Sequence, residues 1–149
     1  MIEKNVFEFK TDIDFNFLSK ILDENNYTSV FGANWHESFI LNGTFLIRNV
    51  ENNNNFSFLK EHLDLRFKKQ DETSNLHMFF SFKSGATSIT HEDNEDVYII
   101  GAMGRTLYKI NNEEVVVEKG DLMKIPSNTL HTAIGLTPRV ILSYGTYHA

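Results

Sequence analysis

The second half of the chain is a succession of short segments rich in β-branched and aromatic residues, separated by polar or glycine-containing breaks. Such residues favour strands, and short strands at even spacing are typical of a closed or two-layered β-barrel. This pattern predicts a mainly β fold. The expected strands are 76–83, 87–90, 97–100, 106–110, 114–117, 122–125, 132–135 and 139–147.

The first half of the chain mixes helical and β-like patterns. Apolar residues at helical spacing behind an aspartate cap predict a short helix that stops near Asn25 and Asn26, and a second apolar series predicts another helix. Between them, Asn42 and Gly43 divide two apolar runs and predict a hairpin over 38–50. The first series is Phe15, Leu18, Ile21 and Leu22 behind Asp12 or Asp14, and the second is Phe56, Leu59, Leu63 and Phe67.

A chain of 149 residues normally forms one domain, and no linker long enough to separate two domains interrupts this one. We therefore expect a single domain over 1–149. Its N-terminal region of helices and strands would occupy 1–75, and its β-barrel core would occupy 76–149.

Charge and composition narrow the classes of function. The net charge of -6 disfavours partners that bind through phosphates, so no nucleic acid is expected. The absence of cysteine excludes disulfides and thiolate metal sites and leaves nitrogen and oxygen as metal ligands. No stretch approaches the roughly 18 apolar residues of a membrane span, and the start lacks the apolar core of a signal peptide. We expect a soluble, cytoplasmic protein with no membrane partner.

Candidate metal ligands occur in two blocks of the barrel region. His91 and Asp93 are separated by one residue, so on a strand both side chains would point to the same face. His131 follows a turn that contains Pro126, which could bring it opposite the first two. Two imidazoles and one carboxylate form a facial triad, the ligand set that leaves positions open on iron(II) for a co-substrate and oxygen.

The two blocks resemble the two motifs of the cupin superfamily. The second motif, G-x5-P-x-G-x2-H, is matched at Gly120, Pro126 and His131, with Asn128 at the inner glycine. The first motif, a glycine, five residues and His-x-His, is matched from Gly85 to His91 but has Asp93 as its last member. Val97 stands where many cupins carry a glutamate ligand. The HxD pattern and Gly104, thirteen residues after His91, resemble instead the JmjC-like and asparaginyl-hydroxylase-like branch.

This resemblance implies a double-stranded β-helix, or jelly-roll barrel, and an iron(II)- and 2-oxoglutarate-dependent dioxygenase that hydroxylates its substrate. His91, Asp93 and His131 would hold iron(II) or another divalent metal. These hydroxylases place a lysine at the position of Thr106, so another cation must pair with the distal carboxylate. Arg139 is the first candidate for that role. The weaker candidates are Lys83 and Lys109, and the residues expected to line the co-substrate pocket are Ser88, Thr106 and Tyr108.

Two other functions fit the same motifs. One is a metal-dependent cupin that does not use 2-oxoglutarate, namely a small-molecule dioxygenase, isomerase or lyase. The other is a non-catalytic, ligand-binding cupin. We interpret Asp121 as a turn residue and Glu92, Glu95 and Asp96 as solvated acids rather than ligands. The substrate, small molecule or protein, is not indicated, and a homodimer is one assembly that would cover the apolar sheet faces.

Overall fold

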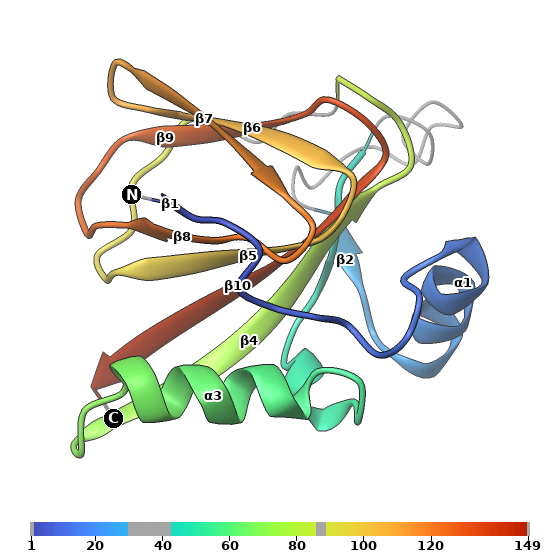
Figure 1. Cartoon of the computed structure of the whole chain (residues 1–149), viewed down its shortest axis with the longest axis horizontal. Helices are drawn as coiled ribbons and strands as arrows, with labels where there is room; N and C mark the ends of the chain where they lie inside the picture. The colour runs from blue at the N-terminus through green and yellow to red at the C-terminus, as the bar shows by residue number, and fades with distance from the viewer. Residues whose placement is uncertain (1, 30–42, 86–88, 149) are drawn as a thin grey trace.

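The computed structural model of the 149-residue chain describes residues 2–29, 43–85 and 89–148 (Figure 1). The strands form two stacked layers of sheet. The two main helices lie outside these layers. None of the helices in these ranges is long and apolar enough to cross a membrane.

The first half of the chain supplies the helices and three short strands. Asp14, one of the two aspartates predicted as the cap, caps the first helix by accepting a hydrogen bond from the Phe17 backbone N–H at 2.9 Å. Leu18 and Ile21 are buried on its inner face, whereas Phe15 is 69% exposed. The elements are β1 (Ile2–Glu3), α1 (Phe15–Glu24), β2 (Thr28–Ser29), β3 (Phe45–Ile47), the 3-10 helix η1 (Val50–Asn52) and α3 (Ser57–Phe67).

The second half of the chain forms the barrel strands. They are β4 (Glu72–Ser81), β5 (Val97–Met103), β6 (Arg105–Ile110), β7 (Glu113–Glu118), β8 (Leu122–Ile125), β9 (His131–Gly135) and β10 (Arg139–His148). Each of these overlaps an expected strand, although β4 begins four residues before its expected start at residue 76. For the expected strand at 87–90, residues 87 and 88 lie outside the described part, and Ile89 and Thr90 are not in a strand. The predicted hairpin over 38–50 also falls partly outside, at residues 38–42, and β3 pairs with β2 and β4.

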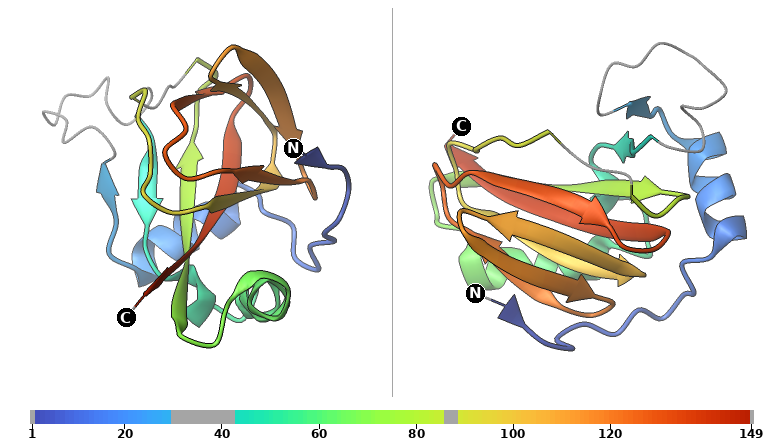
Figure 2. Two further views of the ribbon diagram at one scale, coloured as in Figure 1. Left: turned by 90° about the vertical axis from the view of Figure 1, so that its left-hand side faces the viewer. Right: turned by 90° about the horizontal axis from the view of Figure 1, so that it is seen from above.

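The strands form two antiparallel sheets between which the chain alternates. The large sheet has the order β1-β8-β5-β10-β4-β3-β2, and the small sheet has the order β7-β6-β9. The chain passes from β5 in the large sheet to β6 and β7 in the small one, returns to β8, crosses to β9 and returns to β10. This alternation is the predicted double-stranded β-helix (Figures 1 and 2). Strands from both halves of the chain belong to the large sheet.

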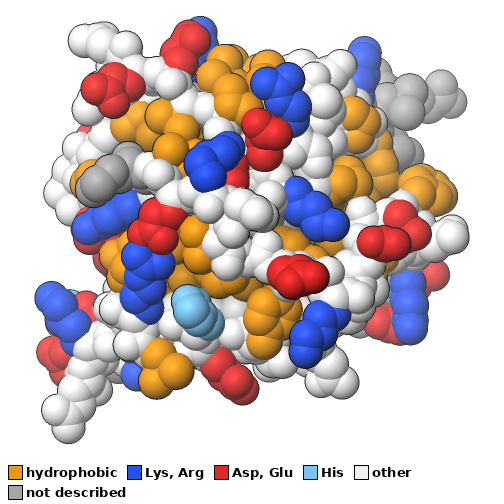
Figure 3. Space-filling view, viewed as in Figure 1, with side chains coloured by type: hydrophobic (Ala, Val, Ile, Leu, Met, Phe, Trp, Pro, Cys, Tyr) orange, Lys and Arg blue, Asp and Glu red, His pale blue; other side chains and the backbone are white. Residues whose placement is uncertain are grey.

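The large sheet is covered on both faces. Its outer face packs against α1, α3 and η1, which lie on the side away from the small sheet in Figure 2. The inner face and the small sheet enclose a second, smaller apolar cluster. On the molecular face in Figure 3, acidic and basic side chains are interspersed among apolar ones. The smaller cluster is Ile99, Tyr108, Val117, Met123, Ile125, Ala133 and Ile141.

Candidate metal centre and cavity

The two segments that carry the candidate ligands are paired by their backbones. The His91 N–H donates to the His131 carbonyl at 3.0 Å, and the His131 N–H donates to the His91 carbonyl at 2.9 Å. His131 is the first residue of β9, so this reciprocal pair extends the small sheet by one residue beyond β9. In an antiparallel pair, directly opposite residues project to the same face. Both imidazoles therefore emerge on one side of the small sheet.

A left-handed turn brings the carboxylate beside the imidazoles. Asn128 has φ +55°, the conformation expected for a residue that replaces the motif's glycine. Its backbone N–H donates to the Asp93 carbonyl at 2.7 Å. The neighbouring Ser127 N–H donates to Asp96 Oδ1 at 2.9 Å, and Lys124 Nζ lies 2.7 Å from Asp96 Oδ2. The loop that carries Asp93 is thus fastened to the turn that precedes His131.

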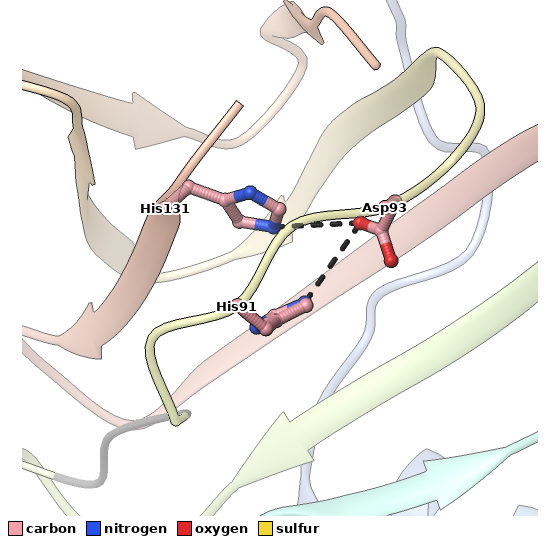
Figure 4. A group of neighbouring side chains, drawn as sticks. All are labelled: His91, Asp93 and His131. Carbon is pink, nitrogen blue, oxygen red and sulfur yellow. Dashed lines mark ion pairs between the residues drawn. The ribbon is translucent and has the colours of Figure 1, made fainter. Parts of the chain in front are cut away.

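His91, Asp93 and His131 converge on one point (Figure 4). Each offers one ligand atom, and these atoms lie within 4.8 Å of one another. Asp93 Oδ2 is 3.8 Å from His91 Nε2 and 3.6 Å from His131 Nε2. The His131 side chain is buried, whereas those of His91 and Asp93 are partly open to solvent. The group therefore has one buried ligand and an accessible side.

Backbone carbonyls orient both imidazoles. His91 Nδ1 is 2.7 Å from the Ile89 carbonyl, and His131 Nδ1 is 2.9 Å from the Thr129 carbonyl. A carbonyl only accepts, so Nδ1 carries the proton in each neutral ring and Nε2 holds the lone pair. Such a hydrogen bond at the far nitrogen is the usual support of a metal-binding histidine. Both lone pairs point toward Asp93, which is the arrangement that a divalent ion requires.

The three ligand residues border a cavity of about 390 Å³ between the sheets. The cavity wall on the large sheet comes from β4, β5 and β10, and the opposite wall comes from β6 and β9. Thr44 and residues near the end of β10 complete it. Besides the ligand residues, the lining consists of Thr44, Asn75, His77, Phe79, Glu95, Val97, Ile99, Tyr108, Ala133, Arg139, Ile141, Ser143, Gly145, Thr146 and Tyr147.

Arg139 places a buried cation on this cavity. The residue is 2% exposed, and its Nε donates to Ser81 Oγ at 3.3 Å. Burial lowers the pKa of Arg139, and the neighbouring Tyr108 partly offsets the shift. Within residues 2–29, 43–85 and 89–148, no carboxylate pairs with this guanidinium. A Cβ on Gly135 would lie 3.2 Å from Arg139 Nε, so the glycine leaves room for the side chain.

The two pocket residues expected on β6 differ in their placement. Tyr108 is buried and lines the cavity, and burial raises its pKa to about 12, so its hydroxyl stays a donor at neutral pH. Thr106 is also buried, but it does not line the cavity. It pairs with Gly135, against which the Arg139 side chain packs. Thr106 is thus buried on β6 beside the Arg139 side chain, and its expected contact with a co-substrate stays a prediction.

Among the remaining sequence candidates, Lys83, Lys109 and Asp121 do not line the cavity. Lys109 is exposed and pairs with Glu114 at 3.7 Å, and Lys83 is also exposed. Ser88 lies outside the described residues. Asp121 accepts backbone hydrogen bonds from Asn5 and Glu118, as expected of a turn residue, and also binds Lys4.

Sequence reasoning did not single out several residues of the cavity wall, among them Thr44 and His77. Thr44 is 3% exposed, and its hydroxyl has no hydrogen-bond partner in the described part of the chain. His77, interpreted from sequence as an ordinary surface or core histidine, projects from the inner face of β4. The period of two along β4 places His77 on the same face as Phe79, but only the fold shows that this face borders a cavity.

Comparisons with known proteins bear on the fold. No protein-family model matches the chain, and no curated protein is similar to it in sequence. Its fold is similar to solved structures of the ribosomal oxygenase YcfD from Escherichia coli. The complex with cobalt and 2-oxoglutarate has a TM-score of 0.76 at 19% identity, over 100% of this chain and 48% of that chain. The complex with cobalt and succinic acid has a TM-score of 0.75 at 20% identity, over the same shares.

This chain therefore spans about half the length of the YcfD chain, 48%. The likeness confirms the fold, a double-stranded β-helix, to which the motifs pointed. The two structures named here are of one oxygenase, and one of them was solved with cobalt and 2-oxoglutarate.

Proposed function

We propose that the protein is an iron(II)- and 2-oxoglutarate-dependent oxygenase of the cupin, JmjC-like type that hydroxylates its substrate. The observation that carries this proposal is Arg139. A buried guanidinium with no carboxylate partner in the described ranges faces the same cavity as a His-Asp-His group. Burying a charge is costly unless an opposite charge compensates it. A ligand carboxylate bound in the cavity would supply that charge.

His91, Asp93 and His131 would hold the metal through two nitrogens and one carboxylate oxygen. This donor set suits iron(II) and leaves positions open, although other divalent ions accept the same ligands. When bound, the metal would supply the oxygen chemistry, and the protein would supply binding, orientation and electrostatics. Val97 lines the cavity at the position of the fourth cupin ligand, which keeps the group at three protein ligands.

The end of the cavity at Arg139 suits the distal carboxylate of 2-oxoglutarate. The Tyr108 hydroxyl is a neutral donor beside Arg139. Thr44 precedes β3, whose Phe45 pairs with Phe80, so Thr44 is level with Ser81, the partner of Arg139. The buried Thr44 hydroxyl has no partner among the described residues and would donate to the same carboxylate. Charge-assisted hydrogen bonds from such donors are strong. Arg139 thus takes the role of the lysine that Thr106 replaces.

The direct experiment adds 2-oxoglutarate to the iron(II)-loaded protein under anaerobic conditions. We expect a metal-to-ligand absorption band in the visible range and binding heat by calorimetry. Arg139→Met should remove about 2–5 kcal/mol of binding free energy for 2-oxoglutarate, because the distal carboxylate would be left buried without its partner. Arg105→Met is the matched control, since Arg105 lies exposed on β6. It should bind 2-oxoglutarate like the wild type.

The stability of the metal-free variants separates binding from folding. Removing an uncompensated buried charge should leave the stability of Arg139→Met unchanged or raise it. A protein that binds iron(II) but gives no band and no heat with 2-oxoglutarate would overturn the proposal. It would then be a metal-dependent cupin with another reaction. A protein that binds no divalent metal would be a non-catalytic, ligand-binding barrel.

A further inference from the structure

The inner wall of the large sheet changes character along its length. Its registered inward pairs from β4 and β10 begin with Arg139 and Ser81, and apolar Phe79 with Ile141 comes next. The next inward pair is polar, His77 with Ser143, and these last two pairs line the cavity. The residues that alternate with them on the outer face of the same strands are apolar and fully buried. The inner face therefore becomes polar at a level where the outer face stays apolar. The inward pair that follows, Asn75 with Gly145, also lines the cavity, and the outward residues are Leu76, Met78, Leu142 and Tyr144.

His77 is held as a hydrogen-bond donor toward the cavity. Its Nδ1 accepts the Asn49 backbone N–H at 3.1 Å, so the proton of the neutral ring lies on Nε2. Asn49 has φ +57° and ψ +46°, a left-handed conformation that is uncommon outside glycine. Burial lowers the pKa of His77, Glu51 opposes that shift and Arg48 adds to it, so the ring is neutral at physiological pH. Its Nε2–H has no partner within the described ranges.

Gly145 is not required by the backbone or by packing. Its φ is not positive, and a Cβ added there would meet only Asn75 Oδ1, at an ordinary contact distance of 3.6 Å. Glycine within a strand weakens it and often marks a place where a ligand approaches the backbone closely. The space beside Gly145 is part of the cavity. This glycine therefore keeps open a space that any side chain would fill.

We propose that the wall formed by Asn75, His77, Ser143 and Gly145, here called the polar wall, is a substrate subsite for an uncharged amide group. The assignment rests on the proposed function, because it takes this cavity to be the active site. The His77 Nε2–H would donate to the amide oxygen. The Asn75 side chain and the Ser143 hydroxyl, which have no partner of their own within the described ranges, would accept from the amide N–H.

The charges around the polar wall favour an uncharged ligand. A carboxylate would need a cation, and the cavity's arginine lies at the other end of the β10 wall, at Arg139. A cationic group would meet the His77 N–H donor. Glu95 also lines the cavity, but it is exposed and its charge is screened by water. An amide carries both the acceptor and the donor that the wall complements.

The test uses the full chain loaded with zinc(II), which is diamagnetic, and NMR correlation of the imidazole nitrogens. His77 should show a proton on Nε2 and none on Nδ1. Adding N-methylacetamide, a secondary amide like a peptide bond, or acetamide, a primary amide like a side chain, should shift the His77 Nε2–H signal. The stronger binder of the two identifies the source of the amide. Acetate and methylguanidinium should leave the signal in place.

The second part of the test uses a variant whose side chain fills the space beside Gly145. Gly145→Val should abolish the amide-induced shift and leave the His77 tautomer and the affinity for 2-oxoglutarate unchanged. Gly145→Ala should weaken the shift without abolishing it. An unchanged shift in Gly145→Val, a proton on Nδ1 of His77, or an equal response to acetate or methylguanidinium would overturn the amide assignment.

The two proposals fail in different ways. If the iron(II) protein shows no 2-oxoglutarate band while the amides still shift His77, the proposed function falls and the polar wall remains an amide site. If the band appears and the amides have no effect, the subsite assignment falls alone.

Discussion

The two faces of the large sheet serve different purposes although they belong to the same strands. On β10, Leu142 faces outward into the main core and is fully buried, whereas Ser143 faces inward to the cavity. The outer face is filled with apolar side chains beneath α1 and α3. The inner face carries Arg139, His77 and Gly145. Packing does not require a glycine at position 145. Stability is concentrated on one face of these strands and binding groups on the other, so neighbouring substitutions should separate the two properties.

The largest stability effect is expected on the outer face. Leu142→Ala should lower the free energy of unfolding by about 2–5 kcal/mol, because it leaves a cavity in a fully packed cluster. Ser143→Ala, one residue further along β10, should change it by about 0.5 kcal/mol or less. Denaturant unfolding of the metal-free protein measures both. Equal losses would show that the inner face contributes as much to stability as the outer one.

Metal binding should stabilise the protein through His91, Asp93 and His131, which lie beside the small sheet and not on the outer face of the large one. Cobalt(II) at one hundred times its Kd should raise the free energy of unfolding by about 2.7 kcal/mol. Asp93→Ala should abolish this gain, because it removes one of three ligands. The exposed neighbour Glu92 provides the control, and Glu92→Ala should keep the gain. A gain that survives in Asp93→Ala would place the metal elsewhere.

An acidic residue fastens α3 to the outer face of the sheet. Asp64 accepts hydrogen bonds from Tyr144 at 2.7 Å, from Lys60 at 2.7 Å and from Ser74. Burial raises the pKa of Asp64, but these hydrogen bonds together lower it below its usual value. Asp64→Asn should cost about 1–3 kcal/mol of unfolding free energy at neutral pH.

The same pKa shift predicts a pH dependence. The contribution of ionised Asp64 is complete above the usual aspartate pKa of about 3.9 and is lost as pH falls through the lower folded value. Denaturation curves between about pH 6 and pH 2 should therefore fall more steeply for the wild type than for Asp64→Asn. Asp71→Asn is the control, because the pair that Asp71 forms with His148 is exposed to solvent. Parallel curves for wild type and Asp64→Asn would contradict the assignment.

The smallest expected change in the free energy of unfolding is a gain, and it tests the inner face of the large sheet. Gly145→Ala should raise the free energy of unfolding by about 0.4–1 kcal/mol, because alanine loses less backbone entropy and meets no clash. Gly101→Ala should instead destabilise, since its Cβ would lie 2.0 Å from the Glu118 carbonyl oxygen. Thermal or denaturant unfolding compares the pair. A destabilised Gly145→Ala would mean that the fold, and not a ligand, requires this glycine.

The sequence predicted the elements that depend on local patterns. The helix behind Asp14 and the barrel strands follow from capping and from the period of apolar residues. The grouping of His91 with Asp93 was predicted from strand geometry, but in the structure only His91 forms a β-bridge and Asp93 lies in the loop that follows it. His131 was added because the turn at Pro126 could bring it opposite the first two residues, and the resemblance to cupin motifs supports the same grouping. These predictions succeed because each uses contacts between residues that are close along the chain or a motif of fixed spacing.

The residues that were missed or only partly placed depend on pairing between distant segments. Thr106 was assigned to the inward face of β6. It pairs with Gly135, and the Arg139 side chain packs against that glycine, which the local sequence pattern does not encode. Thr44 reaches the cavity because β3 pairs with β4. His77 becomes a donor because the Asn49 backbone N–H occupies its other nitrogen. Such relations arise from sheet register, which a single sequence does not fix.

The reciprocal backbone bonds between His91 and His131 make the candidate metal site a reporter of folding. These ligands come from segments that are far apart in the sequence and meet only when β9 is in place. Closing such long loops is entropically costly, so pairings of this kind tend to form late in folding. A chain stalled before that step would have both imidazoles but no site between them. In a refolding experiment, the uptake of cobalt would therefore count the molecules whose barrel has closed.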